Sequence, residues 1–431
     1  MPIKKTESEQ DKEKMTKIRW QIPLVLMISL MVSYFDRMNI TFALPMIARD
    51  YGWTVAETGK YGGMLMSMFF IGYGIATIFL SPIGERFGAK NSIITIVVLF
   101  SIVTCLQAPF GMILTAFVAI RVLLGLVSGI HGPMMGVLTE KWFPINERSR
   151  ANSIWFCGIF AAMILAPVIV VPLCEVVGWK MMFVVIGIVG MIITLPLLKL
   201  LVYESPEEHP KISKSEISYI QKGRIIDTEK ETALSFMSSV KFLWQQKIFW
   251  LVIILGIMNN MIAFGLLSWM PTFFTEGRKL AFSHLVYATS LPYILSIVGA
   301  LSWAYFGDKT NKRGYLSCIA FLGTGIMICL AATTFSIPLI IFYFAATIFF
   351  SAAYNANEIA FIQRIVPSER TGTGIGIYLG ISMMLGGGLG PVVVGSVVSA
   401  TGSYDYGLIT LAGVCLVCSF LVFFLGRKLK Y

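Results

Sequence analysis

The segment Gly-Glu-Arg-Phe-Gly-Ala-Lys at residues 84–90 separates two long apolar runs, and a related charge pattern returns at 308–313. The two patterns are 223 residues apart, and each directly follows an apolar run. A second pair has nearly the same spacing, since the Pro and Glu-Arg of 144–148 return at 367–370, at offsets of 223 and 222. Two independent repeats at one offset indicate a duplicated unit.

Twelve apolar runs surround these loops, and each is long enough to cross a hydrocarbon core roughly 30 Å thick. Of the 431 residues, 56% are hydrophobic and 13% charged, and the mean hydropathy is +0.78, whereas soluble chains carry roughly 25% charged residues. This composition excludes a soluble enzyme, a nucleic-acid-binding protein and a disordered scaffold. The expected spans are 21–48, 59–81, 91–110, 112–138, 151–174, 179–202, 248–274, 284–306, 315–335, 338–362, 372–400 and 405–426.

Basic residues set the expected orientation. With the N-terminus inside, the cytoplasmic segments hold 26 of the 34 Lys and Arg residues. The external loops, counted with the first two residues of the spans that follow them, hold five, and the rest of the spans three. Because positive residues favour the cytoplasmic side, we expect both termini there, in a multi-pass protein of the cytoplasmic membrane. The net charge of +11 then reflects orientation in the lipid bilayer, and no nucleic-acid partner is expected.

The longest hydrophilic stretch divides the spans into two sets of six. Ser213 and Glu216 within it form a capping-box pattern, which predicts a short amphipathic helix. Parallel repeats of this kind bind substrate between halves that rock about it. The predicted fold is an all-α membrane protein with 12 transmembrane helices in two pseudo-symmetric six-helix bundles, as a monomer. Its parts are a tail at 1–20, bundles at 21–202 and 248–426, a linker at 203–247 and a tail at 427–431.

The sequence lacks the features of an enzyme or an ATP-driven pump. No span carries a nucleophile–base pair or clustered metal ligands, and the phosphate-binding GxxxxGK[ST] pattern does not occur. All seven cysteines lie in apolar runs, including the CxxC of Cys415 and Cys418, so neither a disulfide framework nor a zinc site is expected. We expect no enzymatic activity, no cofactor and no metal.

Six motifs, quoted at the end of this paragraph, resemble those of the major facilitator superfamily, and of its anion:cation symporter family in particular. The resemblance runs from about residue 20 to 425 and implies a carrier of small organic anions, with a proton as the coupling ion. Bacterial members of that family import sugar acids such as hexuronates, galactonate and glucarate. The motifs are Ser-Tyr-Phe-Asp-Arg-Met-Asn-Ile at 33–40, the segment 84–90, Arg-Val-Leu-Leu-Gly at 121–125, Trp-Phe-Pro-Ile-Asn-Glu-Arg at 142–148, Gly-Trp-Lys-Met-Met-Phe at 178–183 and Glu-Ser-Pro-Glu-Glu-His-Pro at 204–210.

Two arginines within spans are the main candidates for anion binding. Arg37 lies about 24 Å along an outward-running helix and Arg121 about 14 Å along an inward-running one, so both reach a similar depth. Guanidinium groups suit a planar carboxylate, and the resemblance assigns anion binding to both positions. The alternative is a structural ion pair within the bundle.

Asp36 is the expected proton-coupling residue, because a carboxylate balanced between desolvation and a nearby arginine can bind and release a proton. The alternative is a permanently charged partner that holds spans together. The resemblance implies a second carboxylate seven residues after Arg121, but Ser128 stands there and cannot titrate. His131 could replace it as a proton site or could simply pack against neighbouring helices.

Two further positions concern the substrate itself. The resemblance places Tyr73 beside the substrate, with aromatic packing as the alternative. Met384 stands where the resemblance implies an asparagine. Losing the carboxylate and the asparagine together indicates a less hydroxylated substrate, or one that is held differently. The predicted substrate-binding residues are Arg37, Arg121, Tyr73 and Ser128.

Charged residues near the inner ends of spans predict a cytoplasmic gate. Glu358 is expected to pair with Lys309 or Arg313, with substrate contact as the alternative, and Glu140 is placed beside Arg86. The predicted gate residues are Glu85, Arg86, Glu140, Asp308, Lys309 and Glu358.

The predicted function is secondary active transport of a small organic anion, a sugar acid or related carboxylate, by alternating access with proton symport. The rival is a major facilitator exporter, facilitator or exchanger of another metabolite or drug, without proton coupling. Two arginines facing a cavity favour anions, because exporters of cationic drugs need acidic, aromatic cavities.

Overall fold

The computed structural model describes residues 15–228, 236–310, 313–367 and 370–428, and every regular element within these ranges is helical. Eleven helices in the described part are long and apolar enough to span a membrane. One of them, α9 (Ile145–Leu201), has 57 residues and would be about 85 Å long if straight. It turns at Gly178, whose φ of 78° is left-handed and favours glycine. α9 therefore contains two spans, and the twelve predicted spans are confirmed.

The spans are helical because a helix satisfies its own backbone hydrogen bonds where water is absent. Four short helices, α3 (Val55–Glu57), α5 (Ser81–Phe87), α10 (Lys214–Thr228) and α11 (Phe236–Gln245), lie between them. The spans of the first half are α2 (Gln21–Tyr51), α4 (Gly63–Phe79), α6 (Ala89–Phe110), α7 (Leu114–Ser128) continued by α8 (His131–Trp142), and α9. Those of the second half are α12 (Lys247–Thr272), α13 (Leu285–Thr310), α14 (Arg313–Thr333), α15 (Ile337–Ile365), α16 (Thr371–Ile381) continued by α17 (Gly387–Thr401), and α18 (Tyr404–Lys428).

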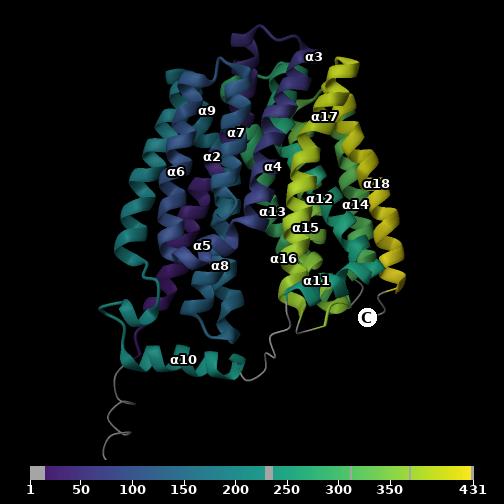
Figure 1. Cartoon of the computed structure of the whole chain (residues 1–431). Coiled ribbons are helices and arrows are strands. Elements are labelled where there is room, and N and C mark those ends of the chain that lie inside the picture. The colour runs from purple at the N-terminus through teal and green to yellow at the C-terminus, as the bar shows by residue number, and fades with distance from the viewer. Residues whose placement is uncertain (1–14, 229–235, 311–312, 368–369, 429–431) are drawn as a thin grey trace, which may run out of the picture.

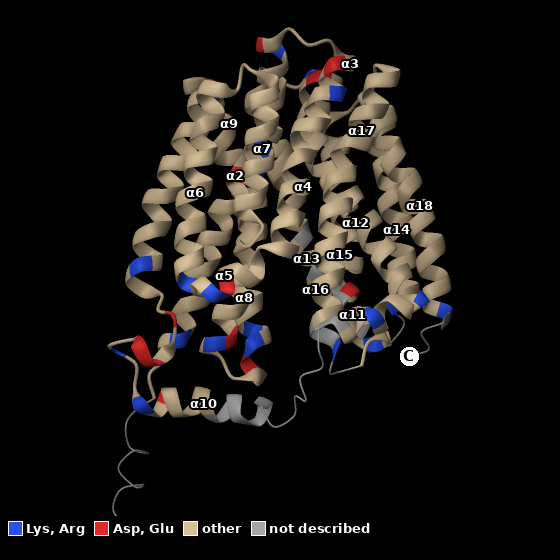
Figure 2. Cartoon of the chain, viewed as in Figure 1, with Lys and Arg blue, Asp and Glu red and all other residues tan. Residues whose placement is uncertain are grey.

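The two sets of spans form two bundles that stand side by side (Figure 1). The helix α10 and the C-terminal end lie at one end of the molecule, which we call the linker side. Lys and Arg gather at this side, whereas the spans carry few charges (Figure 2). The expected cytoplasmic orientation rests on this distribution.

The bundles touch each other on the side away from the linker. A Cβ atom at Gly59 would lie 2.5 Å from the carbonyl oxygen of Gly395, so the backbone that leads into α4 is in contact with the backbone of α17. Nearer the middle, the rings of Phe70 and Phe264 have centroids 4.6 Å apart. A shallow space on the far side, lined by residues such as Arg49 and Glu276, lies beyond these contacts. The contacts separate it from the space between the halves on the linker side.

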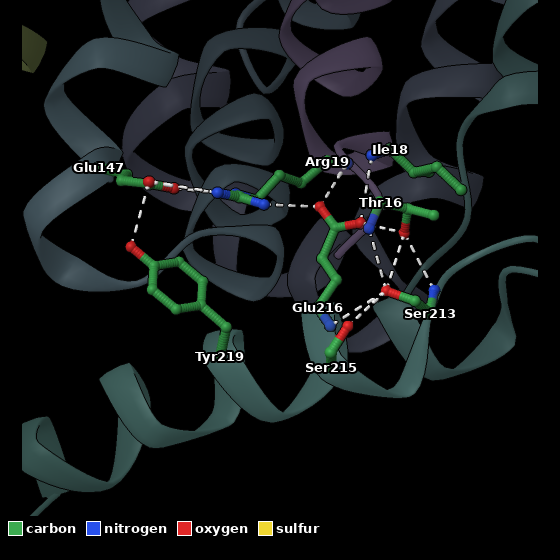
Figure 3. A network of polar contacts seen from close by, with 8 residues as sticks. All are labelled: Thr16, Ile18, Arg19, Glu147, Ser213, Ser215, Glu216 and Tyr219. Carbon is green, nitrogen blue, oxygen red and sulfur yellow. Dashed lines mark hydrogen bonds and ion pairs between the residues drawn. The ribbon is translucent and has the colours of Figure 1, made fainter. Parts of the chain in front are cut away.

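A network of buried ion pairs fastens the linker helix to the first bundle (Figure 3). The Arg19 guanidinium donates to Glu147 at 2.8 Å and to Glu216 at 2.7 Å. Tyr219 donates its hydroxyl to Glu147 at 3.2 Å, and Thr16 donates to Glu216 at 2.6 Å. One arginine thus joins the start of α2, the start of α9 and α10.

The predicted capping box at α10 is only half formed. The backbone N–H of Glu216 donates to the Ser213 hydroxyl at 3.2 Å, as expected. The Glu216 carboxylate does not return to Ser213, because it accepts hydrogen bonds from Thr16, Ile18 and Arg19 instead. The Ser213 N–H donates to the Thr16 hydroxyl at 3.0 Å. A tertiary contact therefore replaces the local one.

Glu204, which follows α9, holds the loop before α6. Its carboxylate accepts hydrogen bonds from the backbone N–H groups of Ala89 and Lys90 at 2.9 and 2.8 Å, and from the Lys141 ammonium group. Burial raises the pKa of Glu204, but these donors outweigh burial and bring the pKa below its ordinary 4.5. The negative charge stabilises the first turn of α6.

Candidate substrate-binding cavity

A cavity of about 360 Å³ lies between the bundles, on the linker side of their contact. Its walls come from α2, α4, α7, α8 and α9 of the first half and from α12, α15 and α16 of the second. This volume falls in the range of small-molecule sites, about 300–1,000 Å³. Because both bundles contribute walls, a rocking motion of one against the other would open or close the cavity.

Arg37 is the cation that lines this cavity. It is 6% exposed, and its Nε and Nη1 atoms have no hydrogen-bond partner among the described residues. Its guanidinium carbon lies 4.3, 4.7 and 5.0 Å from the ring centroids of Tyr34, Tyr73 and Phe69. The three rings stabilise the positive charge and hold the group in place. The unpartnered N–H donors could still bind a carboxylate if the side chain turned toward the cavity.

Arg121 does not line the cavity in this conformation. It is 1% exposed, and its Nε donates to the Leu65 carbonyl at 3.1 Å. The Phe69 ring contacts both arginines, because its centroid lies 5.3 Å from the guanidinium carbon of Arg121 and 5.0 Å from that of Arg37. A space of only about 10 Å³ touches both arginines, which is at the lower limit for a single water molecule. Because one space touches both arginines, they lie at a similar depth, as predicted. The role of Arg121 in binding stays a prediction.

Asp36 lies behind the cavity wall together with Arg121. It is 2% exposed, and both its carboxylate oxygens lack a hydrogen-bond partner within the described part of the chain. The two opposite charges attract each other across this interior. Asp36 and Arg37 are neighbours in sequence, yet only Arg37 faces the cavity, because successive side chains on a helix point about 100° apart.

Three more of the residues predicted for substrate binding or proton coupling line the cavity, namely Tyr73, Ser128 and His131. His131 is 2% exposed, and its Nε2 atom is 3.0 Å from the Ser29 hydroxyl. That contact suits a packed, hydrogen-bonded histidine. Its Nδ1 atom has no partner among the residues described. The Tyr73 ring packs on Arg37, which fits the packing alternative, and its contact with a substrate stays a prediction.

The predicted gate residues are not brought together in this conformation. Glu85 and Arg86 are exposed. Glu140 pairs with Arg148 at 3.7 Å and not with Arg86. The side chain of Asp308 lies outside the described residues. The gate itself remains a prediction for the conformation in which the linker side is closed.

Glu358 differs from its expected place. Its carboxylate accepts a hydrogen bond from the Tyr378 hydroxyl at 2.7 Å and lines the cavity. It does not pair with Lys309, whose ammonium group lies over the Tyr305 ring at 5.8 Å. The physical reason is that α15 and α16 meet at this level, so the nearest donor belongs to the neighbouring helix.

Two residues of the Arg37 site were not predicted. Tyr34 precedes Arg37 by three residues and Phe69 precedes Tyr73 by four, so each lies one helical turn from a residue that was predicted. That spacing was the available signal. Met384, at the position expected to be asparagine, packs near Gly74 and does not line the cavity.

Twelve spans in two bundles around a cavity that contains a buried arginine define a membrane transporter of the alternating-access class. No group of three metal-ligating side chains occurs among the described residues. The sequence matches the model of the Major Facilitator Superfamily over residues 26–391 and 284–430, and the chain belongs to that superfamily.

Individual relatives agree with this assignment. The chain is 25% identical over 415 residues to the probable galactarate/D-glucarate transporter GudP of Bacillus subtilis, covering 92% of this chain and 89% of that protein. It is 27% identical over 321 residues to the chloroplastic probable anion transporter 4 of Oryza sativa subsp. japonica, covering 72% of this chain and 53% of that protein. This second match thus spans about half of the rice protein.

A solved structure shares the fold. It is that of a bacterial homologue of the human lysosomal transporter Spinster in an inward-facing, unoccupied conformation, with a TM-score of 0.80 and 17% identity. The match covers 96% of this chain and 98% of that one.

Proposed function

We propose that this transporter carries a small organic anion, either a sugar acid or a related carboxylate, across the cytoplasmic membrane. The observation that carries the proposal is Arg37, a buried cation in the cavity wall whose Nε and Nη1 atoms have no hydrogen-bond partner among the described residues. An unpaired buried charge is unfavourable, and a carboxylate that accepts two parallel hydrogen bonds would compensate it. The relation to a probable galactarate/D-glucarate transporter supports an anion as substrate.

The other residues complete the proposed site. Tyr73 and Ser128 offer hydroxyl groups beside Arg37, and Arg121 balances Asp36 from behind Phe69. Both termini and the linker lie in the cytoplasm in this proposal, so the conformation described here is open inward. The chain acts as a monomer, because each bundle supplies one half of the cavity.

Coupling to a proton is assigned to Asp36. A carboxylate in an apolar interior is favoured as an anion only while a cation is near it. Movement of the bundles and the arrival of a substrate anion both change the charge around Arg37 and Arg121. Asp36 can therefore take up a proton in one state and release it in the other, which links transport to a pH gradient.

Uptake of radiolabelled carboxylates into proteoliposomes tests the anion site. Arg37→Gln is expected to reduce uptake at least tens-fold, because removing one partner of a buried charge pair costs about 2–5 kcal/mol. Arg49→Gln is the matched control, since Arg49 is an exposed arginine at the end of the same helix. Wild-type uptake in Arg37→Gln would remove Arg37 from the substrate site.

An uncoupled facilitator or exchanger of another metabolite or drug is the second candidate. It is favoured by one observation, that Ser128 lines the cavity where a second carboxylate was expected. Uptake into proteoliposomes that does not respond to an imposed pH gradient supports this candidate and excludes proton symport.

A further inference from the structure

A second pocket, of about 270 Å³, adjoins the Arg37 cavity on the side of the second bundle. The helices α9, α12 and α15 line both spaces, with Ile159 in one wall and Phe160 in the other. On α15, Asn355 of the second pocket precedes Glu358 of the first by one helical turn. Phe264 and Leu267 of the second pocket also border the small space that touches Arg37. The two spaces can therefore act as two compartments of one substrate site.

The second compartment is walled mainly by aliphatic and aromatic side chains. Ile262, Phe264 and Leu267 of α12 face Ile348 and Ala352 of α15 across it. In the described part of the chain, none of its lining residues is an Asp, Glu, Lys, Arg or His. A compartment of this kind suits a group that gains free energy by leaving water.

Three of its four polar side chains, those other than Tyr293, make hydrogen bonds within the protein. The Thr347 hydroxyl donates to the Tyr343 carbonyl at 2.8 Å, and the Ser351 hydroxyl donates to the Ile348 carbonyl at 3.0 Å. The amide oxygen of Asn355 accepts from Asn259 at 2.8 Å. Of the two spaces, the first has an arginine in its wall, Arg37, and the second has none. The site is thus polar at one end and apolar at the other.

We propose that the substrate is a monocarboxylate with an apolar, ring-sized body, such as an aryl or cycloalkyl carboxylate. This inference rests on the proposed function, because Arg37 must bind the carboxylate. The ring then occupies the second compartment between Phe264 and Ala352. The absence of a carboxylate at Ser128, a group suited to hydroxyl recognition that would line the cavity, agrees with this chemistry.

Sugar acids fit the same site poorly. Each hydroxyl that enters the second compartment gives up its water partners and meets few free donors or acceptors. A buried polar group left without a partner weakens binding roughly tenfold. A sugar acid with several hydroxyls is therefore expected to bind far more weakly than a ring of the same size without them.

Ligand titrations of the purified protein test the inference. The probes are phenylacetate and cyclohexanecarboxylate as apolar acids, D-glucuronate and D-gluconate as sugar acids, and propionate as a carboxylate without a ring. Dissociation constants come from calorimetry. We expect the apolar acids to bind at least tenfold more tightly than the sugar acids, and Arg37→Gln to abolish binding of all probes.

Substitutions in the second compartment distinguish the contribution of the ring to binding from that of the carboxylate. Ser351→Leu fills the compartment and should weaken phenylacetate binding at least tenfold while leaving propionate unchanged. Ala352→Val is a smaller change that serves if Ser351→Leu does not fold. Phe342→Leu is the control, since Phe342 lies on the same helix but is 60% exposed on its outer face.

Three outcomes overturn the inference. Sugar acids that bind as tightly as phenylacetate refute it and leave the proposed anion transport intact. Phenylacetate binding that is unchanged in both Ser351→Leu and Ala352→Val removes the second compartment from the site. Failure of every carboxylate to bind the wild type refutes both this inference and the proposed function.

Discussion

Replacing Glu216 by glutamine would remove the centre of the network that fastens the linker to the first bundle. Glu216 is 0% exposed, and its carboxylate accepts hydrogen bonds from Thr16, Ile18 and Arg19. Glutamine keeps the shape of the side chain but loses the charge, and its amide group presents donors toward other donors. Arg19 then retains Glu147 as its only carboxylate partner.

The size of the effect follows from burial. Breaking a buried ion pair by removing one partner costs about 3–5 kcal/mol. The lower end applies here, because Arg19 keeps Glu147 and is not left unpaired. A cost of about 3 kcal/mol increases the undocked population of α10 roughly hundredfold. The separate hydrogen bonds are not added to this figure, since groups in one network are not independent.

Hydrogen exchange of the backbone amides of α10 measures that population directly. Exchange in Glu216→Gln should accelerate by one to two orders of magnitude at α10 and residues 15–20, and stay unchanged in α14 and α18. Glu208→Gln is the control, because Glu208 is an exposed carboxylate of the same linker. Exchange rates at α10 equal to those of the wild type would refute the reasoning.

Four further substitutions test the coupling, the linker contact and the closure of the far side. Asp36→Asn should retain exchange between loaded vesicles and lose accumulation driven by a pH gradient, whereas Ser128→Glu should increase the protons moved per substrate; pH-driven accumulation by Asp36→Asn contradicts the assignment. Because the folded pKa of Glu204 lies below 4.5, its contacts stabilise the protein above pH 4.5 and are lost as the pH falls through the folded pKa. Glu204→Gln should therefore lower the free energy of unfolding by about 1 kcal/mol at pH 7, and should not change it at a pH below the folded pKa, where the wild-type carboxyl is protonated. Thermal unfolding of both proteins at these two pH values measures the difference. Equal unfolding midpoints at pH 7 would contradict the contact. Gly59→Val would place carbon atoms against the backbone of α17 and so open the far side. In alternating access the linker side then closes, so labelling of Leu379→Cys from the linker side should fall several-fold. Unchanged labelling would count against closure at this contact.

The architecture could be predicted because it depends on local properties of the chain. A span needs only length and apolar composition, and the turn at Gly178 lies where one predicted span ends and the next begins. The repeated charge patterns at 84–90 and 308–313 revealed the duplication without any knowledge of contacts. The positions of Arg37 and Arg121 along their helices also followed from residue counting, since the rise per residue is constant.

Tertiary packing alone decided which of these residues face the cavity. Arg37 and Arg121 both contact the Phe69 ring, but only Arg37 lines the larger space. Glu216 forms a capping pattern in sequence, yet Arg19 takes its carboxylate because a buried charge is stabilised more by a counter-ion than by one backbone N–H. The apolar second compartment is made by residues of four helices that are far apart in the chain, so no single stretch of sequence contains it. Local composition determines that a helix crosses the membrane, whereas the direction in which each side chain points depends on the helices that pack against it.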